Sequence, residues 1–395
     1  MTRVFTALLL IALLGACAAR PTEYARADLD ESQRQWVASH PEALQPHYED
    51  LLAEGRRNEV LNRMELSLVA FRNGHYDHAE RHLDNAIVDI ESVFADNEAA
   101  RRARSLWYQE DEKDFKGEPY ERAMAFLYRG LLFLRAGDYD NARASFMSGL
   151  LQDAFAEEEQ HAADFAAFMY LAGWAAAKAG NERLAAEHFG EFLQFRPDAP
   201  LPEADHNVLV FVETGTSPRK LGDGIGHHQL VYRRGLGFDE VRARIEYAGQ
   251  QHELYPVEDV YFQASTRGGR AVDRIIDGQV EFKRRTESVG TNLTNVTNNS
   301  VVAGLTAGTG VFAVASVAGV TALGLSARAN PRADTRYWQT LPDTLHVYSL
   351  RAEEGETALR VEFLDEQGNP LPELTTSAEI EFDHRGNGIA HASAR

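Results

Sequence analysis

Residues 74–86, GHYDHAERHLDNA, set a pattern that recurs at 137–149, GDYDNARASFMSG, and at 180–192, GNERLAAEHFGEF. Each copy starts with glycine and has a small residue sixth, a large apolar residue tenth and a small or apolar residue thirteenth. These positions, with the tyrosine that the first two copies share, are Gly74, Tyr76, Ala79, Leu83, Ala86, Gly137, Tyr139, Ala142, Phe146, Gly149, Gly180, Ala185, Phe189 and Phe192. Apolar spacings of three and four are typical of helices with one buried face, so the pattern predicts a helical repeat.

This repeat resembles the tetratricopeptide pattern, in which each unit is a pair of antiparallel helices. The resemblance implies that the glycine permits a tight turn, the small residue lets the second helix approach the first, and the large apolar residue fills the gap. The turn glycines are more widely spaced than the ~34 residues of an uninterrupted array, and Glu182 replaces the tyrosine in the third copy. A tetratricopeptide-like domain is expected over residues 32–200, with a generic helical bundle as the alternative.

Helix pairs of this kind cannot bury their apolar faces alone, and stacking them leaves a concave groove. In tetratricopeptide proteins such a groove usually holds a peptide or helix of a partner. The aromatic residues of the repeats are expected to be core residues and not ligand contacts. The helical half therefore predicts a surface for binding another protein.

The N-terminus has the layout of an export signal. A single positive charge at Arg3 precedes the apolar run 4–14, which is too short to cross a ~30 Å hydrocarbon core comfortably. The residues that follow resemble the lipobox of bacterial lipoproteins, namely Leu14, Gly15, Ala16 and Cys17. The resemblance implies a signal peptide at 1–16, palmitate-type lipidation of Cys17 and a tether at 17–31. A plain secretory signal with a buried cysteine is the alternative.

Composition narrows the location and the partners. Apolar residues make up 44% of the chain, which excludes global disorder, and Cys17 is the only cysteine, so no disulfide within the chain is possible. The net charge of −20 gives no cationic footprint for nucleic acid or for anionic lipid head groups. Attachment to a membrane must therefore be covalent or hydrophobic. Ala18 after the cysteine implies, by the same resemblance, the outer membrane with the protein facing the periplasm.

Three prolines, at 197, 200 and 202, end the helical pattern, and the remainder, 201–395, is rich in candidate strands. We predict strands at 208–212, 241–247, 260–262, 345–348, 359–364 and 380–382. They would form a small antiparallel β domain. The fold class predicted for the whole chain is therefore α+β.

The segment 301–326 interrupts this β-rich part. It has no charged residue and is rich in glycine and alanine, with the small-xxx-small spacing of close-packed helix pairs. It is long enough to span a bilayer. A spanning helix, a buried helix or hairpin, and membrane-surface insertion or self-association through the glycine face are the three interpretations.

The sequence contains no pattern that selects catalytic chemistry. His227 and His228 are adjacent, so their side chains do not converge, and no further metal-ligand motif accompanies them. The glycine-rich stretch 222–226 lacks the Gly-Lys-Ser/Thr of a phosphate loop and is expected to be a turn. We predict no catalytic residue, no metal site and no cofactor.

Two further stretches, VFVETGTSPRK at 210–220 and ADTRYWQTLP at 333–342, combine with the lipobox and the interrupted repeats to resemble a family of uncharacterised bacterial lipoproteins. The family's association with other small envelope lipoproteins implies a role in envelope assembly. The leading hypothesis is a non-enzymatic, lipid-anchored adaptor that binds an envelope protein of unknown identity. The alternatives are an envelope hydrolase with a site near Glu213, His227 and His228, and a structural oligomer built on 301–326.

Overall fold

The computed structural model describes residues 26–92, 114–154, 165–223, 229–266, 334–352, 355 and 357–395. The lipobox with Cys17, the histidine pair at 227–228 and the apolar segment 301–326 lie outside the described residues. Among the described residues, no helix combines the length and apolarity needed to cross a membrane. The described chain has an α+β fold, as predicted.

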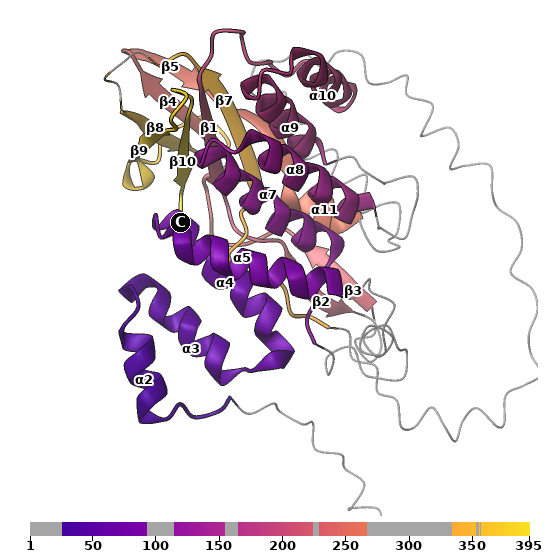
Figure 1. The fold of residues 1–395 in the computed structure, drawn as a ribbon, viewed down its shortest axis with the longest axis vertical. Helices are drawn as coiled ribbons and strands as arrows, with labels where there is room; N and C mark the ends of the chain where they lie inside the picture. The colour runs from indigo at the N-terminus through magenta and orange to yellow at the C-terminus, as the bar shows by residue number, and fades with distance from the viewer. Residues whose placement is uncertain are drawn as a thin grey trace, which may run out of the picture.

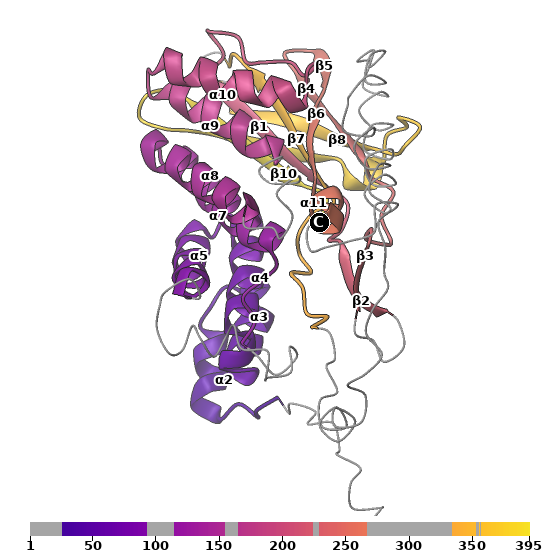
Figure 2. The same cartoon turned by 90° about the vertical axis from the view of Figure 1, so that its right-hand side faces the viewer.

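The first half of the chain is helical. Its helices follow one another from one end of the molecule to the other (Figure 2). They are α2 (Glu31–Ala38), α3 (Gln45–Ala53), α4 (Glu59–Arg72), α5 (Tyr76–Glu91), α7 (Pro119–Arg135), α8 (Tyr139–Ala154), α9 (Ala166–Lys178) and α10 (Glu182–Phe195). The closest pairs are α4 with α5, α7 with α8 and α9 with α10.

The same turn closes all three pairs. Gly74, Gly137 and Gly180 have φ angles of 72°, 73° and 81°, a conformation that glycine adopts without strain. The N–H that follows each glycine donates to a carbonyl five residues earlier, as from Asp138 to Phe133 at 2.9 Å. This 6→1 bond is typical of a Schellman ending. The first glycine of each repeat therefore ends the first helix of a pair.

Glycines also allow the two helices of a pair to approach closely. A Cβ atom added at Gly130 would lie 2.2 Å from the ring of Phe146, and one at Gly173 would lie 2.7 Å from the ring of Phe189. Both glycines stand seven positions before a turn glycine, and Ser67 occupies the same place in the first pair. A small residue at this position therefore belongs to the repeat, although the repeat positions predicted from the sequence do not include it.

We expect Gly130→Ala to lower the free energy of unfolding by about 1–3 kcal/mol, because the new methyl group overlaps the Phe146 ring. Urea denaturation would measure the change. The matched control is Gly190→Ala in α10, where nothing lies within 4 Å of the added Cβ. This control should gain roughly 0.5–1 kcal/mol from helix propensity. A loss of equal size at both glycines would contradict the close approach.

The second half forms an eight-stranded sheet and a separate two-stranded one. The strand order of the large sheet is β5-β4-β8-β9-β10-β1-β7-β6, and β2 pairs with β3. The strands are β1 (Val208–Thr214), β2 (Arg219–Asp223), β3 (Gln229–Arg233), β4 (Arg242–Tyr247), β5 (Gln250–Glu253), β6 (Tyr255–Asp259), β7 (Thr344–Leu350), β8 (Ala358–Leu364), β9 (Thr376–Phe382) and β10 (Gly388–Ser393). Among the described strands of the large sheet, β1 with β10 is the only parallel pair.

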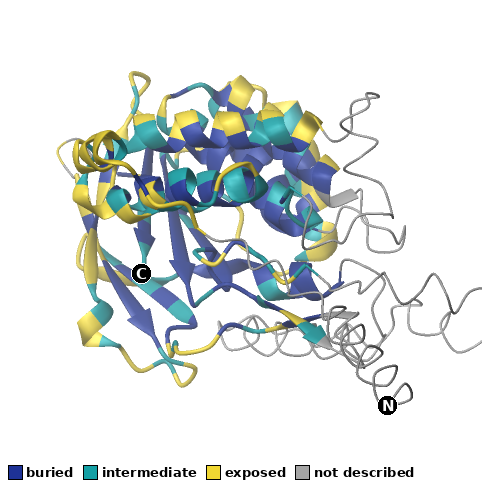
Figure 3. Ribbon diagram, turned by 90° about the horizontal axis from the view of Figure 1, so that it is seen from below, coloured by how far each residue is buried: buried dark blue, intermediate teal, exposed yellow. Residues whose placement is uncertain are grey.

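Every residue of β1 is buried, because both faces of this strand are covered. Leu209 and Phe211 belong to the core that the sheet shares with the helices. Val208 and Val210 belong to a second core, which β4 and β8 complete. The helices lie over one face of the sheet in Figure 1, and Figure 3 shows their exposed residues on the outer side.

The strand β9 joins the two parts of the sheet. Its first residues, from Thr376 to Glu379, pair with β8, and its last, from Ile380 to Phe382, pair with β10. The sheet therefore changes direction within one strand, and β4 and β8 come to lie over β1.

Three expectations about this half need correction or refinement. The sheet is large, whereas a small domain was predicted, and its pairing is mostly and not entirely antiparallel. The predicted strand 260–262 is the start of a helix, α11 (Val260–Thr266). The reason is local: the side chain of Asp259 accepts the N–H of Phe262 at 2.8 Å, the bond of an N-cap. The other predicted strands are present, with bounds shifted by a few residues.

Candidate functional site

An irregular segment of the second half lies against the helices of the first. Residues 334–342, called the strap here, belong to no helix or strand and lead directly into β7. Figure 2 shows the strap as the orange segment near α4. Its contacts reach the start and middle of α4 and the first turn of α7.

The helices hold the strap through its main chain. Glu121 of α7 accepts the N–H of Trp338 at 2.6 Å. Glu65 of α4 accepts the N–H groups of Gln339 and Thr340 at 2.5 and 3.2 Å. Three consecutive backbone donors are thus satisfied by two carboxylates from two different helices. The side chain of Thr340 also hydrogen-bonds to Glu65, so these main-chain bonds are reinforced by one residue of the strap sequence.

Two side chains of the strap add specific contacts. Trp338 is fully buried, with its ring centroid 5.9 Å from that of Tyr128. Arg336 donates to the side-chain oxygen of Asn58 at 2.8 Å and to the carbonyl of Arg57 at 3.1 Å. By contrast, Gln339 is exposed. On another side the strap meets the segment between β1 and β2, where the hydroxyl of Ser217 donates to the carbonyl of Trp338 at 2.7 Å.

Burial changes the protonation of the two carboxylates that hold the strap. Removal from water raises the pKa of Glu121 to about 7, although the positive charge of Lys220 opposes the shift. Burial likewise raises the pKa of Glu65 to about 7, with the strap's hydrogen bonds opposing it. Both groups therefore titrate near neutral pH.

A buried ion pair joins α4 to the sheet at a second place. The Nε of Arg72 donates to Glu213 at 2.8 Å, and His391 of β10 lies 3.2 Å from the other carboxylate oxygen. Burial alone would raise the pKa of Glu213, but Arg72 and His391 outweigh it and lower the pKa to about 2. An ionised carboxylate held in this way is an acceptor that docks α4 onto β1, and it has no proton to donate near neutral pH.

The tyrosines of the repeats provide a third connection. Tyr76 donates a hydrogen bond to Glu381, and Tyr139 donates one to Asp383. Arg135 also pairs with Glu381 at 2.5 Å, with its guanidinium 3.6 Å from the centroid of the Tyr76 ring. The rings of these two tyrosines belong to the core or pack against it, as expected. Their hydroxyl groups in addition fasten the helix pairs to the end of β9 and the residue that follows it.

The remaining repeat residues lie where the pattern predicts. Their side chains are buried in the core or packed against it, and the three turn glycines are in the left-handed conformation. A Cβ atom at Gly149 would lie 2.4 Å from the ring of Phe168, which explains the lack of a side chain there. The repeat residues therefore build the scaffold, whereas the strap contacts come from residues outside the repeated set.

The pH dependence of stability should reveal the buried Glu121. The unfolded chain releases this proton near pH 4.5, whereas the folded chain keeps it up to about pH 7. The resulting stabilisation is fully present below about pH 4.5 and is lost as the pH rises through about 7. Glu213 has the opposite sign, since its stabilisation is present above about pH 4.5 and is lost as the pH falls through about 2.

Wild-type protein should therefore lose more unfolding free energy between about pH 5 and about pH 8 than Glu121→Gln, measured by urea denaturation at both values. Burial lowers the pKa of His78 and His82. Their contribution to stability therefore increases as the pH rises over part of this range, opposite to that of Glu121. Both histidines are present in the two proteins, so their effect cancels in the comparison. Equal losses in the two proteins would contradict the raised pKa of Glu121.

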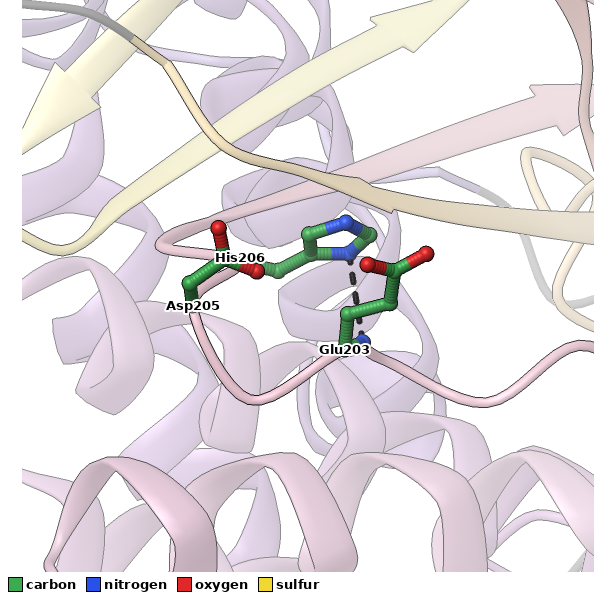
Figure 4. Close-up of side chains that lie close together, drawn as sticks. All are labelled: Glu203, Asp205 and His206. Carbon is green, nitrogen blue, oxygen red and sulfur yellow. Dashed lines mark hydrogen bonds between the residues drawn. The ribbon is translucent and has the colours of Figure 1, made fainter.

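One group in the described part of the chain has ligand atoms close enough to hold a metal ion, namely Glu203, Asp205 and His206 (Figure 4). The two acidic residues are exposed. The Nδ1 of His206 lies 2.9 Å from the hydroxyl of Ser349 and 3.4 Å from the backbone nitrogen of Glu203, which donates to it. These contacts hold the turn before β1, and we assign the group to that structural role.

Taken together, the strap, the Arg72–Glu213 pair and the tyrosine contacts bring residues of the second half against the helix pairs. The site holds an irregular polypeptide segment and contains no arrangement of a nucleophile and a base among the described residues. No protein-family model matches this chain, and no curated protein or solved structure is significantly similar to it. The chemistry of the strap contacts is therefore the main guide to function.

Proposed function

We propose that this chain is a lipid-anchored adaptor of the bacterial outer membrane, which faces the periplasm and binds an envelope protein through tetratricopeptide-like helix pairs. Three turns with one geometry and the close helix contacts at Gly130 and Gly173 support the tetratricopeptide-like assignment. The lipobox at 14–17 supports the anchor. The resemblance to an envelope lipoprotein family points in the same direction.

The observation that carries the proposal is the way in which the helices hold the strap. Two carboxylates, from α4 and α7, accept three consecutive main-chain N–H groups, and an aromatic side chain fills the space beside them. A peptide of another protein could offer the same main-chain N–H groups, and an aromatic residue that fills a buried pocket is a frequent anchor of protein contacts. The helix pairs thus have the chemistry of a peptide-binding surface.

The anchor is tested by replacing the thiol. Cys17→Ser should abolish palmitate labelling and move the protein from the membrane fraction to the soluble fraction, because acyl chains supply the membrane affinity. Ala18→Ser is the matched control, since it keeps the thiol and should keep both properties. Unchanged labelling and fractionation of Cys17→Ser would refute the anchor.

The binding surface is tested by cross-linking in the envelope. A photoreactive residue at Gln339, which is exposed beside the helices, should form a cross-link to a partner. The control position is Gln250, which is equally exposed but lies on the edge strand β5, at the end of the sheet. A partner captured at Gln250 and not at Gln339 would place the interface on the sheet and would overturn the assignment to the helix pairs.

A further inference from the structure

The strap makes contacts that a segment of another protein could make equally well. Most of its bonds to Glu65 and Glu121 use main-chain N–H groups, which every residue other than proline supplies, and the side chain of Thr340 adds a bond to Glu65. A second polypeptide in the same conformation would satisfy the same carboxylates. Nothing in this part of the recognition requires the acceptor and the donor to belong to one chain.

Two positions in the strap would set the sequence preference of such a segment. Trp338 fills a buried space beside Tyr128, so a large aromatic ring is needed there. Two residues earlier, the guanidinium of Arg336 meets the oxygen atoms of Arg57 and Asn58 at the start of α4. The matching ligand is therefore a peptide with arginine two residues before a large aromatic residue.

The strap is also held in a way that permits exchange. It pairs with no strand and contributes to no helix, so its removal would break no ladder of backbone hydrogen bonds. Its exposed residues, Thr335 and Gln339, leave one side open to an incoming segment. The strap ends before β7, which pairs with both β1 and β6 and so would stay in place.

We propose that the strap is an internal substitute for the partner's binding segment, and that an Arg-x-aromatic peptide of the partner displaces residues 334–342 from α4 and α7. This inference rests on the proposed adaptor function and names its partner class. While the strap is bound, the apparent affinity for the peptide is reduced by the fraction of molecules whose surface is open. The bound strap therefore lowers the affinity of the chain for the partner's peptide.

The test uses the full chain and a fluorescent peptide with the sequence of residues 334–342, DTRYWQTLP. Gln339→Pro removes the N–H that Glu65 accepts at 2.5 Å and so weakens the bound strap, while it leaves Trp338 in place. Fluorescence anisotropy should show that this variant binds the peptide roughly tenfold or more tightly than wild type. Trp338→Ala is a second variant, which weakens the bound strap further by removing its buried ring, and it should increase the peptide affinity at least as much.

Two controls separate the strap site from unspecific binding. The peptide DTRYAQTLP, which lacks the aromatic ring, should bind weakly to every form of the protein. Adding Glu65→Ala and Glu121→Ala to Gln339→Pro should remove the gain, because the two side chains supply the acceptors of the peptide backbone.

Circular dichroism shows whether each variant is folded, so that a change in peptide binding can be told apart from a loss of structure. If the variants fold and bind the peptide no better than wild type, the strap is a permanent part of the fold and the inference is wrong. If both strap variants unfold, the inference is also wrong, since an indispensable segment cannot be exchanged. The adaptor proposal has its own tests, namely the labelling and fractionation of Cys17→Ser and the cross-link at Gln339, so its failure is distinguished from failure of this inference.

Discussion

Replacing Arg72 with alanine should lower the free energy of unfolding by about 3–5 kcal/mol, because the carboxylate of Glu213 would remain buried without its cation. Glu213 is 1% exposed and lies on the fully buried strand β1, so water cannot replace the guanidinium easily. His391 would remain as a weaker partner at 3.2 Å. Urea denaturation, followed by far-ultraviolet circular dichroism, would measure the loss.

The control for this prediction is a salt bridge of similar chemistry on the surface. Arg183 and Glu187 form an ion pair along α10, with side chains that are 77% and 51% exposed. Arg183→Ala should change the free energy of unfolding by less than about 1 kcal/mol, because solvent screens the pair. If both arginine variants lost the same amount, the Arg72–Glu213 pair would not be the main link between α4 and the sheet.

Trp338→Ala should also be strongly destabilising, by about 3–5 kcal/mol in urea denaturation. The indole ring is fully buried beside Tyr128, and its removal leaves a cavity between the strap and α7. Trp36→Ala is the natural comparison, since Trp36 is 45% exposed and its loss should be clearly smaller. Similar losses at the two tryptophans would mean that the strap contributes little to the stability of the whole chain.

The local features of this fold could be predicted from the sequence. The turn glycines, the buried small residues and the helices between them follow from apolar spacings of three and four, and most strands follow from short runs of apolar residues. The exception at 260–262 has a local cause, because Asp259 caps a helix where the apolar run alone favoured a strand. Local patterns carry this information because the contacts that they describe are close in the sequence.

The candidate site could not be predicted in the same way. Trp338 is 217 residues from Glu121, and Gln339 is 274 residues from Glu65. No spacing rule connects such pairs, and a glutamate on a helix is usually a solvated residue. The segment 333–342 was singled out by a family resemblance, but the resemblance gave no indication of what it contacts.

The same long separation affects the order in which the molecule folds. Each helix pair closes over a turn of a few residues, whereas the strap must return across most of the chain, and the entropic cost of closing a loop grows with its length. Contacts of short range form fastest. We therefore expect the helix pairs to gain protection from hydrogen exchange before the strap docks. In a newly made molecule, the surface of α4 and α7 would then be vacant for a time before its own covering segment arrives.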